Sequence, residues 1–126
     1  MMEKLFLDSS IIISILEGDS NGIKAAKMLV GSEAMTNIIC YCEVLNKANQ
    51  AKLSKAEELL SKILVMPIAI ADGYIAKQIQ IRGRKDGHHL KTLDALIAAT
   101  AINSNAVFLT LDKDFERIQG LKKQIF

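Results

Sequence analysis

The stretch that decides the fold is KLFLDSSIIISIL, residues 4–16. Its first apolar residues predict a buried strand over Lys4 to Leu7. Asp8 then interrupts the apolar run, and Ser10 can cap a helix that continues to Leu16. A strand that passes directly into a helix begins a βαβ unit. Asp8 is therefore expected at the carboxyl end of the first strand.

Apolar runs and segments of helical period alternate along the rest of the chain. Its 126 residues are expected to form a single domain, residues 1–126. The alternation predicts an α/β fold with three α/β/α layers and a mostly parallel central sheet. The further strands are expected over Glu33 to Thr36, Ile63 to Ile70, Ala106 to Thr110 and Lys123 to Ile125. The further helices are expected over Asn21 to Val30, Ile38 to Lys52, Ser54 to Lys62, Gly73 to Arg82 (capped by Asp72) and Leu93 to Ile102 (capped by Thr92).

The composition favours a reducing, cytoplasmic setting. Cys40 and Cys42 are too close in sequence for a useful disulfide, and both are expected to be small helix residues. No apolar run approaches the ~20 residues of a membrane span, so no membrane partner is expected. The net charge of +2 permits nucleic acid binding without arguing for it.

Acidic residues recur where the predicted strands end or the predicted helices begin. An unpaired carboxylate at Asp8 would be costly to bury, and no obvious Lys or Arg partner stands beside it. A divalent cation is the expected partner. Asp112 and Asp114 follow another strand, while Glu43 and Asp94 lie on helices. Because ligands collect at the carboxyl ends of parallel strands, four acids could share one crevice.

Each acid also has a purely structural explanation. Asp8 could cap the helix that follows it, and Glu43 could pair with Lys47 one helical turn away. Asp94 lies in the first turn of its helix, where the macrodipole favours an anion. Asp112 could cap the turn that follows it. Their joint placement on one predicted edge of the sheet is what favours a metal site.

Four segments carry a family resemblance: FLDSS at residues 6–10, CEVL at 42–45, DALIAATA at 94–101 and LTLDKDF at 109–115. Together they resemble the PIN-domain nucleases, and within them the VapC-type toxins of toxin–antitoxin pairs. The resemblance covers essentially the whole chain, and the segment at 94–101 is its most specific part. It implies an endoribonuclease that hydrolyses RNA phosphodiesters with Mg²⁺ or Mn²⁺.

The resemblance also implies roles for the acids. Asp8 and Asp94 would be the principal metal ligands. Glu43 would be a ligand or would orient the attacking water, and Asp112 would hold a second or water-mediated ion. Asp114 is the alternative to Asp112, which is favoured because it lies nearer the strand end.

Two hydroxyls and a set of cations complete the expected site. Ser10 and Thr110 would orient the carboxylates, and Asp114 would be free to cap or to pair with Arg117. Cations ahead of the last predicted helix would hold RNA phosphates, although they could equally form a solvated loop. These RNA-binding candidates are Arg82, Arg84, Lys85 and Lys91.

The expected partners are RNA, a second copy of the chain and a small antitoxin. Half of the residues are hydrophobic, which predicts a homodimer that covers the apolar helix surface around Ile12 to Leu16 and Ile38 to Leu45. Two other functions remain open. A haloacid-dehalogenase-like phosphatase also has an Asp after its first strand, but its usual second Asp would fall at Ser10. A non-catalytic RNA-binding PIN domain is the other.

Overall fold

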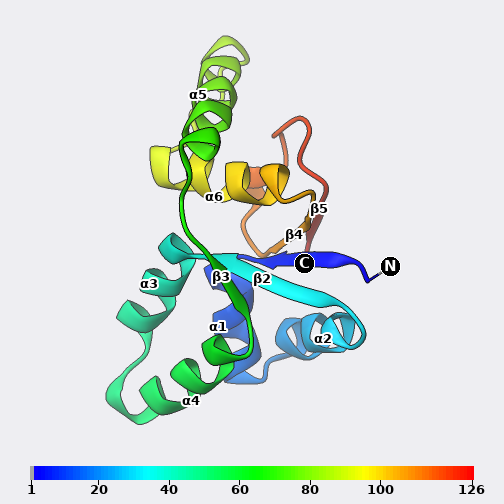
Figure 1. Cartoon of the computed structure of the whole chain (residues 1–126), viewed down its shortest axis with the longest axis vertical. Coiled ribbons are helices and arrows are strands. Elements are labelled where there is room, and N and C mark those ends of the chain that lie inside the picture. The colour runs from blue at the N-terminus through cyan, green and yellow to red at the C-terminus, as the bar shows by residue number, and fades with distance from the viewer. Residues whose placement is uncertain (1) are drawn as a thin grey trace.

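The computed structural model, described here for residues 2–126, is a parallel sheet with helices on both faces (Figure 1). The strand order is β3-β2-β1-β4-β5, and each of the four strand pairings is parallel. The strands are β1 (Lys4–Leu7), β2 (Glu33–Asn37), β3 (Leu64–Met66), β4 (Val107–Thr110) and β5 (Lys123–Ile125). The helices are α1 (Ser9–Glu17), α2 (Ser20–Leu29), α3 (Ile38–Lys47), α4 (Gln50–Ser61), α5 (Ile70–Lys85), α6 (Thr92–Asn103) and the 3-10 helix η1 (Lys113–Phe115). The predicted α/β architecture is confirmed.

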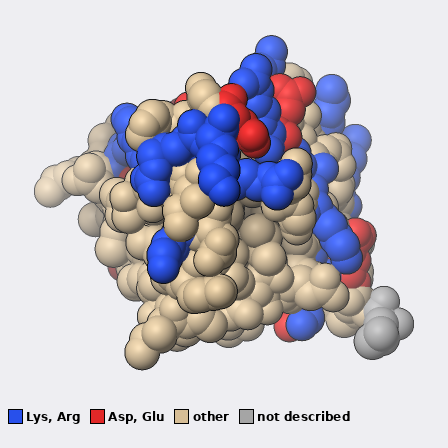
Figure 2. All heavy atoms as spheres, turned by 90° about the horizontal axis from the view of Figure 1, so that it is seen from above, with Lys and Arg blue, Asp and Glu red and all other residues tan. Residues whose placement is uncertain are grey.

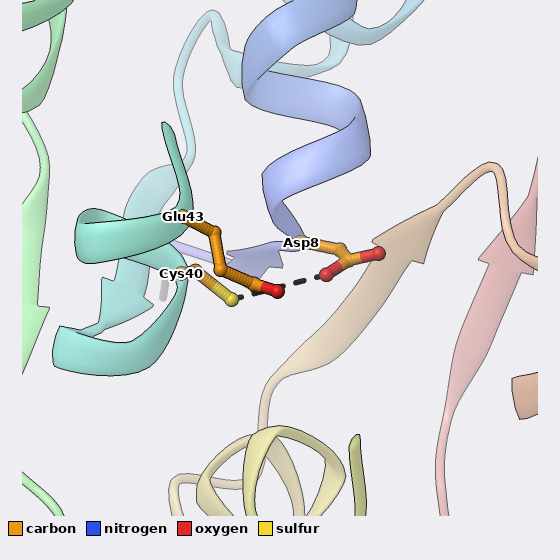
Figure 3. A group of neighbouring side chains, drawn as sticks. All are labelled: Asp8, Cys40 and Glu43. Carbon is orange, nitrogen blue, oxygen red and sulfur yellow. Dashed lines mark hydrogen bonds between the residues drawn. The ribbon is translucent and has the colours of Figure 1, made fainter. Parts of the chain in front are cut away.

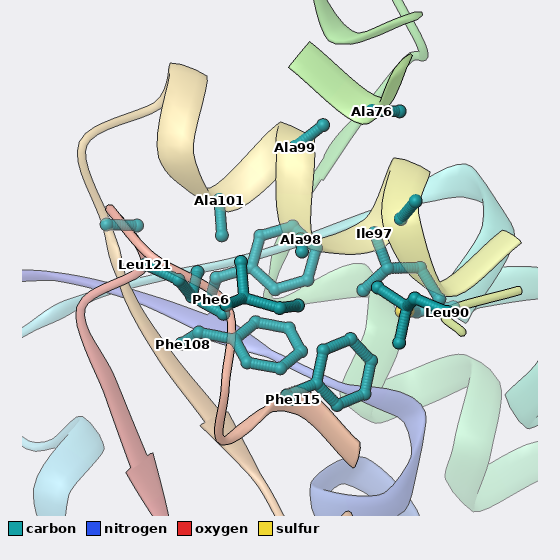
Figure 4. Close-up of a cluster of buried hydrophobic side chains, with 14 of the residues drawn as sticks. Phe6, Ala76, Leu90, Ile97, Ala98, Ala99, Ala101, Phe108, Phe115 and Leu121 are labelled. Atoms are coloured by element: carbon teal, nitrogen blue, oxygen red, sulfur yellow. The ribbon is translucent and has the colours of Figure 1, made fainter. Parts of the chain in front are cut away.

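The central strands send alternate side chains to two separate cores. Leu5 and Leu7 face α1 to α4, whereas Phe6 faces the opposite layer. There Phe6 and Phe108 lie with ring centroids 5.5 Å apart, under the small residues of α6 (Figure 4). Continuous apolar runs in β1 and β4 follow from this burial on both faces.

Two predicted elements in the middle of the chain were wrong. The expected helix over residues 38–52 ends at Lys47, because Asn49 caps a new helix by accepting a hydrogen bond from the Lys52 amide at 3.0 Å. The expected strand over residues 63–70 is limited to β3. Pro67 follows it without an amide hydrogen to donate, and Ile70 already begins α5.

Three helix caps also differ from the prediction. Asp8, not Ser10, caps α1, and its Oδ1 accepts from the Ser9 amide at 2.9 Å. Asp72 lies inside α5, where its carboxylate accepts from the Ala69 amide at 2.8 Å. Thr92 is the first residue of α6 and follows the N-cap. Short polar side chains can act from several positions in the first turn, so the sequence locates a helix start only to within a few residues.

The longest helix, α5, extends three residues beyond the predicted end at Arg82. Arg82, Arg84 and Lys85 therefore lie in its last helical turn, where the macrodipole favours cations. Arg84 and Lys85 were expected beyond the end of this helix, and the structure places them within it. Among residues 2–126, no helix is long and apolar enough to cross a membrane.

The strand order reverses at β1, which pairs with β2 on one side and with β4 on the other. A parallel sheet opens a crevice at the carboxyl ends of its strands where the order reverses. The segments that follow β1 and β4 begin there with Asp8 and Leu111. The fold thus brings residues about a hundred positions apart to one place.

Candidate metal centre

Asp8 is the buried centre of this crevice, with 5% of its surface exposed. Its Oδ2 accepts hydrogen bonds from the Thr110 hydroxyl at 2.7 Å and from the Ser10 hydroxyl at 3.0 Å. The Ser10 oxygen in turn accepts from the Leu111 amide at 3.1 Å. The Asp8 amide donates to the Leu109 carbonyl at 3.0 Å. Hydrogen bonds from β4 and from the first turn of α1 therefore fix the carboxylate in one orientation.

The environment of Asp8 disfavours its charge in the absence of a cation. Burial raises the pKa of Asp8 above 3.8, and hydrogen bonds from Thr110, Ser10 and Ser9 oppose that rise. Neither ion pair found in residues 2–126 involves this carboxylate, because they join Lys62 to Glu58 and Arg82 to Asp86. A cation from solution would compensate the buried charge.

Glu43 extends from α3 toward Asp8, and Cys40 lies one turn earlier on the same helix (Figure 3). Ligand atoms of these three residues lie within 4.8 Å of one another. The Oε1 atom of Glu43 is buried and has no hydrogen-bond partner among residues 2–126. The expected pairing of Glu43 with Lys47 is not among the ion pairs found in residues 2–126. A buried carboxylate oxygen that lacks a donor is well suited to hold a cation.

Asp94 and Asp112 are electrostatically coupled to this group. Partial burial raises the pKa of Asp94, and the negative charge of Asp112 raises it further. Smaller contributions in the same direction come from Asp8 and Glu43, while Lys91 opposes them. The crevice thus concentrates negative charge contributed by α3, α6 and the segment after β4.

The structure separates the two neighbouring acids after β4. Asp112 is half-buried, and its charge raises the pKa of both Asp8 and Asp94. Its carboxylate also accepts from the Asp114 amide at 2.9 Å, which is the capping role that was considered for it. The Asp114 side chain is exposed, and its backbone carbonyl contacts His88 Nε2 at 3.0 Å. Of the two, Asp112 is the acid whose charge acts on Asp8 and Asp94.

A buried hydrogen bond connects α6 to β2 behind the acids. The Asn37 side-chain nitrogen Nδ2 donates to the Thr100 hydroxyl at 3.0 Å. The Asn37 side-chain oxygen Oδ1 caps α3 by accepting from the Cys40 backbone amide. Thr100 donates to the Leu96 carbonyl within α6. One asparagine therefore ties the helix that carries Asp94 to the helix that carries Glu43.

The predicted RNA-binding cations divide into two groups. Lys91 is the N-cap residue of α6 and acts electrostatically on Asp94. Arg82, Arg84 and Lys85 lie at the end of α5, where Arg82 lies 4.0 Å from Asp86. Figure 2 views the face toward which α5 projects and shows Lys and Arg side chains gathered along one side of it. Of the four predicted cations, Lys91 is the one that acts on the acids.

Sequence reasoning missed Cys40 as a member of this group. It was interpreted as a small helix residue, and it is indeed fully buried in the core. Its Sγ nevertheless lies 3.8 Å from Asp8 Oδ1. Its spacing of three residues before Glu43 was the available signal, because residues three apart share one face of a helix.

The donor set of the crevice fits a divalent cation. Carboxylate oxygens are the ligands that Mg²⁺ and Mn²⁺ prefer. Here they surround the buried Asp8, which takes part in no ion pair within residues 2–126. The unpartnered Oε1 of Glu43 offers a ready coordination position. Such a site suits hydrolysis of a phosphate ester, where positive charge must face the phosphoryl oxygens.

Comparison with known sequences identifies one family. The model of the PIN domain matches residues 5–121. Ribonuclease VapC1 of Rickettsia felis is 31% identical over 124 residues, which cover 94% of this chain and 92% of that relative. The matched range includes each acid of the crevice.

Two solved structures have the same fold. The structure of VapBC2 from Rickettsia felis, bound to a DNA fragment from the promoter, aligns with a TM-score of 0.83 and 19% identity over 98% of both chains. A toxin–antitoxin complex from Klebsiella pneumoniae aligns with a TM-score of 0.76 and 22% identity over 93% of this chain and 94% of that chain.

Proposed function

The chain belongs to the PIN-domain family and is a ribonuclease of the VapC kind, and we propose that it hydrolyses RNA phosphodiesters with Mg²⁺ or Mn²⁺ held in the acidic crevice. The observation that carries this proposal is the buried Asp8 carboxylate beside an unpartnered oxygen of Glu43. Free thiols at Cys40 and Cys42 suit a reducing cytoplasm, where we expect the protein to act.

The four acids would have different roles in metal binding and catalysis. Asp8 and Asp94 would be the principal ligands, and the negative charge of Asp8 already acts on Asp94. Glu43 would hold the cation or orient the attacking water, and Asp112 would contribute to a second or water-mediated position. When bound, the divalent cation supplies positive charge next to the phosphate and lowers the pKa of coordinated water.

The chain's own residues would keep this geometry fixed. Thr110 and Ser10 both donate to the Oδ2 atom of Asp8. These hydrogen bonds would keep the carboxylate in the same orientation when a cation binds. Lys91, which is the N-cap residue of α6 and acts electrostatically on Asp94, would contact an RNA phosphate there. Arg82, Arg84 and Lys85 would hold more distant phosphates without reading the base sequence.

A toxin role implies a protein inhibitor. An antitoxin segment could place an Arg or Lys in the crevice, where its charge would substitute for the cation and pair with the carboxylates. Solved toxin–antitoxin complexes share this fold, which supports an antitoxin partner. Co-expression with the adjacent gene should restore growth to cells that the chain alone arrests.

Part of the predicted dimer surface remains available. Ile12 and Val44 are buried within the subunit, whereas Ile38 is 42% exposed. Helix α5 offers a second apolar surface. Ile70 and Tyr74 lie one turn apart on α5 and are 95% and 64% exposed. We propose that this part of α5 contacts the second copy. Light scattering should report a dimer at micromolar concentration, and Tyr74→Glu should shift it to monomer; a wild-type monomer would contradict the proposal.

The activity test uses purified protein and a defined RNA. Cleavage should require added Mg²⁺ or Mn²⁺ and should stop with EDTA. Glu43→Gln should lose cleavage, whereas Glu58→Gln, an exposed acid on α4, should retain it. Equal activity of both variants would assign the cleavage to another site or to a contaminant. Hydrolysis of a phosphomonoester in place of RNA would favour the phosphatase alternative.

A further inference from the structure

We propose that Cys40 makes the crevice a site for thiophilic divalent cations such as Cd²⁺, Co²⁺ and Zn²⁺, with its sulfur as a direct ligand beside Asp8 and Glu43. The proposal rests on the proposed function, in which the same carboxylates hold Mg²⁺ or Mn²⁺. It adds that this chain discriminates among metals through a residue that is not a carboxylate.

The geometry of the three side chains carries the proposal. Cys40 Sγ lies 3.8 Å from Asp8 Oδ1, and one ligand atom from each of the three residues lies within 4.8 Å of the others. A tetrahedral Zn²⁺ with bonds of about 2.3 Å to sulfur and 2.0–2.2 Å to oxygen separates such ligands by roughly 3.6 Å. Small rotations of the Cys40 and Glu43 side chains would therefore bring all three atoms into coordination distance.

Two further observations point to a ligand rather than to packing alone. The Cys40 side chain is fully buried and lies beside the Asp8 carboxylate (Figure 3). The Oε1 atom of Glu43 is buried next to it without a hydrogen-bond partner. The Cys40 thiol donates a hydrogen bond to Asp8 Oδ1 at 3.8 Å, so its sulfur already faces a carboxylate. Here the thiol and the unpartnered oxygen belong to the same group.

Ligand chemistry sets the expected preference. Sulfur binds Zn²⁺ and Cd²⁺ far better than Mg²⁺, which takes oxygen ligands and keeps its waters. Binding through sulfur would displace the Cys40 proton, so the sulfur and the two carboxylates would carry three negative charges around the dication. Mg²⁺ would use the carboxylates alone and leave the thiol protonated. The two classes of cation would thus compete for Asp8 and Glu43.

The exposed Cys42 provides a matched control for the buried Cys40. Wild type, Cys40→Ser and Cys42→Ser are titrated with Cd²⁺, and the ultraviolet sulfur-to-metal charge-transfer band is recorded. The band should appear in wild type and Cys42→Ser and be absent in Cys40→Ser. Calorimetry should show Cd²⁺ affinity reduced about tenfold or more in Cys40→Ser, with Mn²⁺ affinity within about threefold of wild type, because manganese relies on oxygen ligands.

The Mn²⁺ titration separates the possible failures. A Cys40→Ser variant that binds Mn²⁺ normally has an intact crevice, so an undiminished Cd²⁺ band in it would overturn the role of Cys40. Should Cys40→Ser lose Mn²⁺ binding through misfolding, Cys40→Ala is tested in its place. Absence of Mn²⁺ binding from every variant, with a Cd²⁺ band that still depends on Cys40, would overturn the proposed Mn²⁺ site and leave the thiol site standing.

Discussion

The acids in the crevice and the cations at the end of α5 are held in opposite ways. Asp8 is buried and receives hydrogen bonds from β4 and from the start of α1. Arg84 and Lys85 are exposed on the last turn of a helix that projects from the sheet (Figure 1). Charge is concentrated in both regions, but only the crevice prevents its charged groups from moving apart.

This difference separates residues that take part in the reaction from residues that only attract RNA. A reaction requires ligands held to within a fraction of an ångström, and packed strands and helix starts provide that precision. Attraction to a polyanion requires only charge within a Debye length, which flexible surface cations supply. Substitutions in the crevice should therefore abolish a step, whereas substitutions on α5 should weaken an affinity.

The largest effect is expected from Asp8→Asn. Removal of the central negative charge should lower RNA cleavage by more than about a hundredfold, since even outer partners of a metal site cost roughly 10- to 100-fold. Mn²⁺ binding measured by calorimetry should fall with it. Asp114→Asn, an exposed acid on the same side of the sheet, is the control and should behave like wild type. Equal loss in both variants would show that overall charge, rather than the crevice, is what matters.

Thr110→Val tests whether orientation of Asp8 matters separately from its charge. The substitution keeps the shape of the side chain but removes the 2.7 Å hydrogen bond to Asp8 and the acceptor for the Asp112 amide. Cleavage should fall by roughly 10- to 100-fold. Circular dichroism should report an intact fold. Thr92→Val is the control and should cleave normally, because the Thr92 hydroxyl accepts a hydrogen bond from the Gln80 side chain and bonds none of the acids.

The double variant Arg84→Ala with Lys85→Ala tests the second region. RNA binding should weaken several-fold, and the dependence of log affinity on log salt should become shallower by about 0.7 for each phosphate that the variant no longer neutralises. The cleavage rate at saturating RNA should not change, because these residues do not contact the acids. Lys24→Ala with Lys27→Ala, on α2 in the opposite helical layer, is the matched control. A lower cleavage rate at saturating RNA would show that the α5 cations take part in the reaction itself.

The smallest effect concerns the stability of the metal-free protein. Folding raises the pKa of Asp94 above 3.8, so as pH increases the unfolded chain ionises first and the folded state loses stability until its own carboxyl is ionised. Asp94→Asn should therefore melt roughly 2–4 °C higher than wild type at neutral pH. The difference should vanish below pH 3.8. Excess Mn²⁺ should reverse the order by stabilising wild type alone; a lower melting temperature of the variant without metal would contradict the repulsion.

The central strands β1 and β4 were predictable because burial on two faces leaves a continuous apolar run. The edge strand β3 was not, because the apolar run around it is longer than the strand. Lys4–Leu7 was located to the residue, as was the acid that follows it. The ends of the helices were not, because Asn49 and Asp72 can cap or join a helix at several positions. The basic stretch was misplaced for the same reason, since α5 continues through it.

The sequence by itself determined that Asp8 and Asp112 follow strands and that Asp94 begins a helix, because those positions follow from local periodicity. Glu43 lies in the middle of α3. Only the tertiary structure decided which of them meet. Pairing of β1 with β4 places Thr110 on Asp8, across 102 positions of the chain. The orientation of α3 adds Cys40 and an unpartnered oxygen of Glu43 to the same crevice. Strand order and helix rotation are set by packing of the whole core, which no short segment encodes.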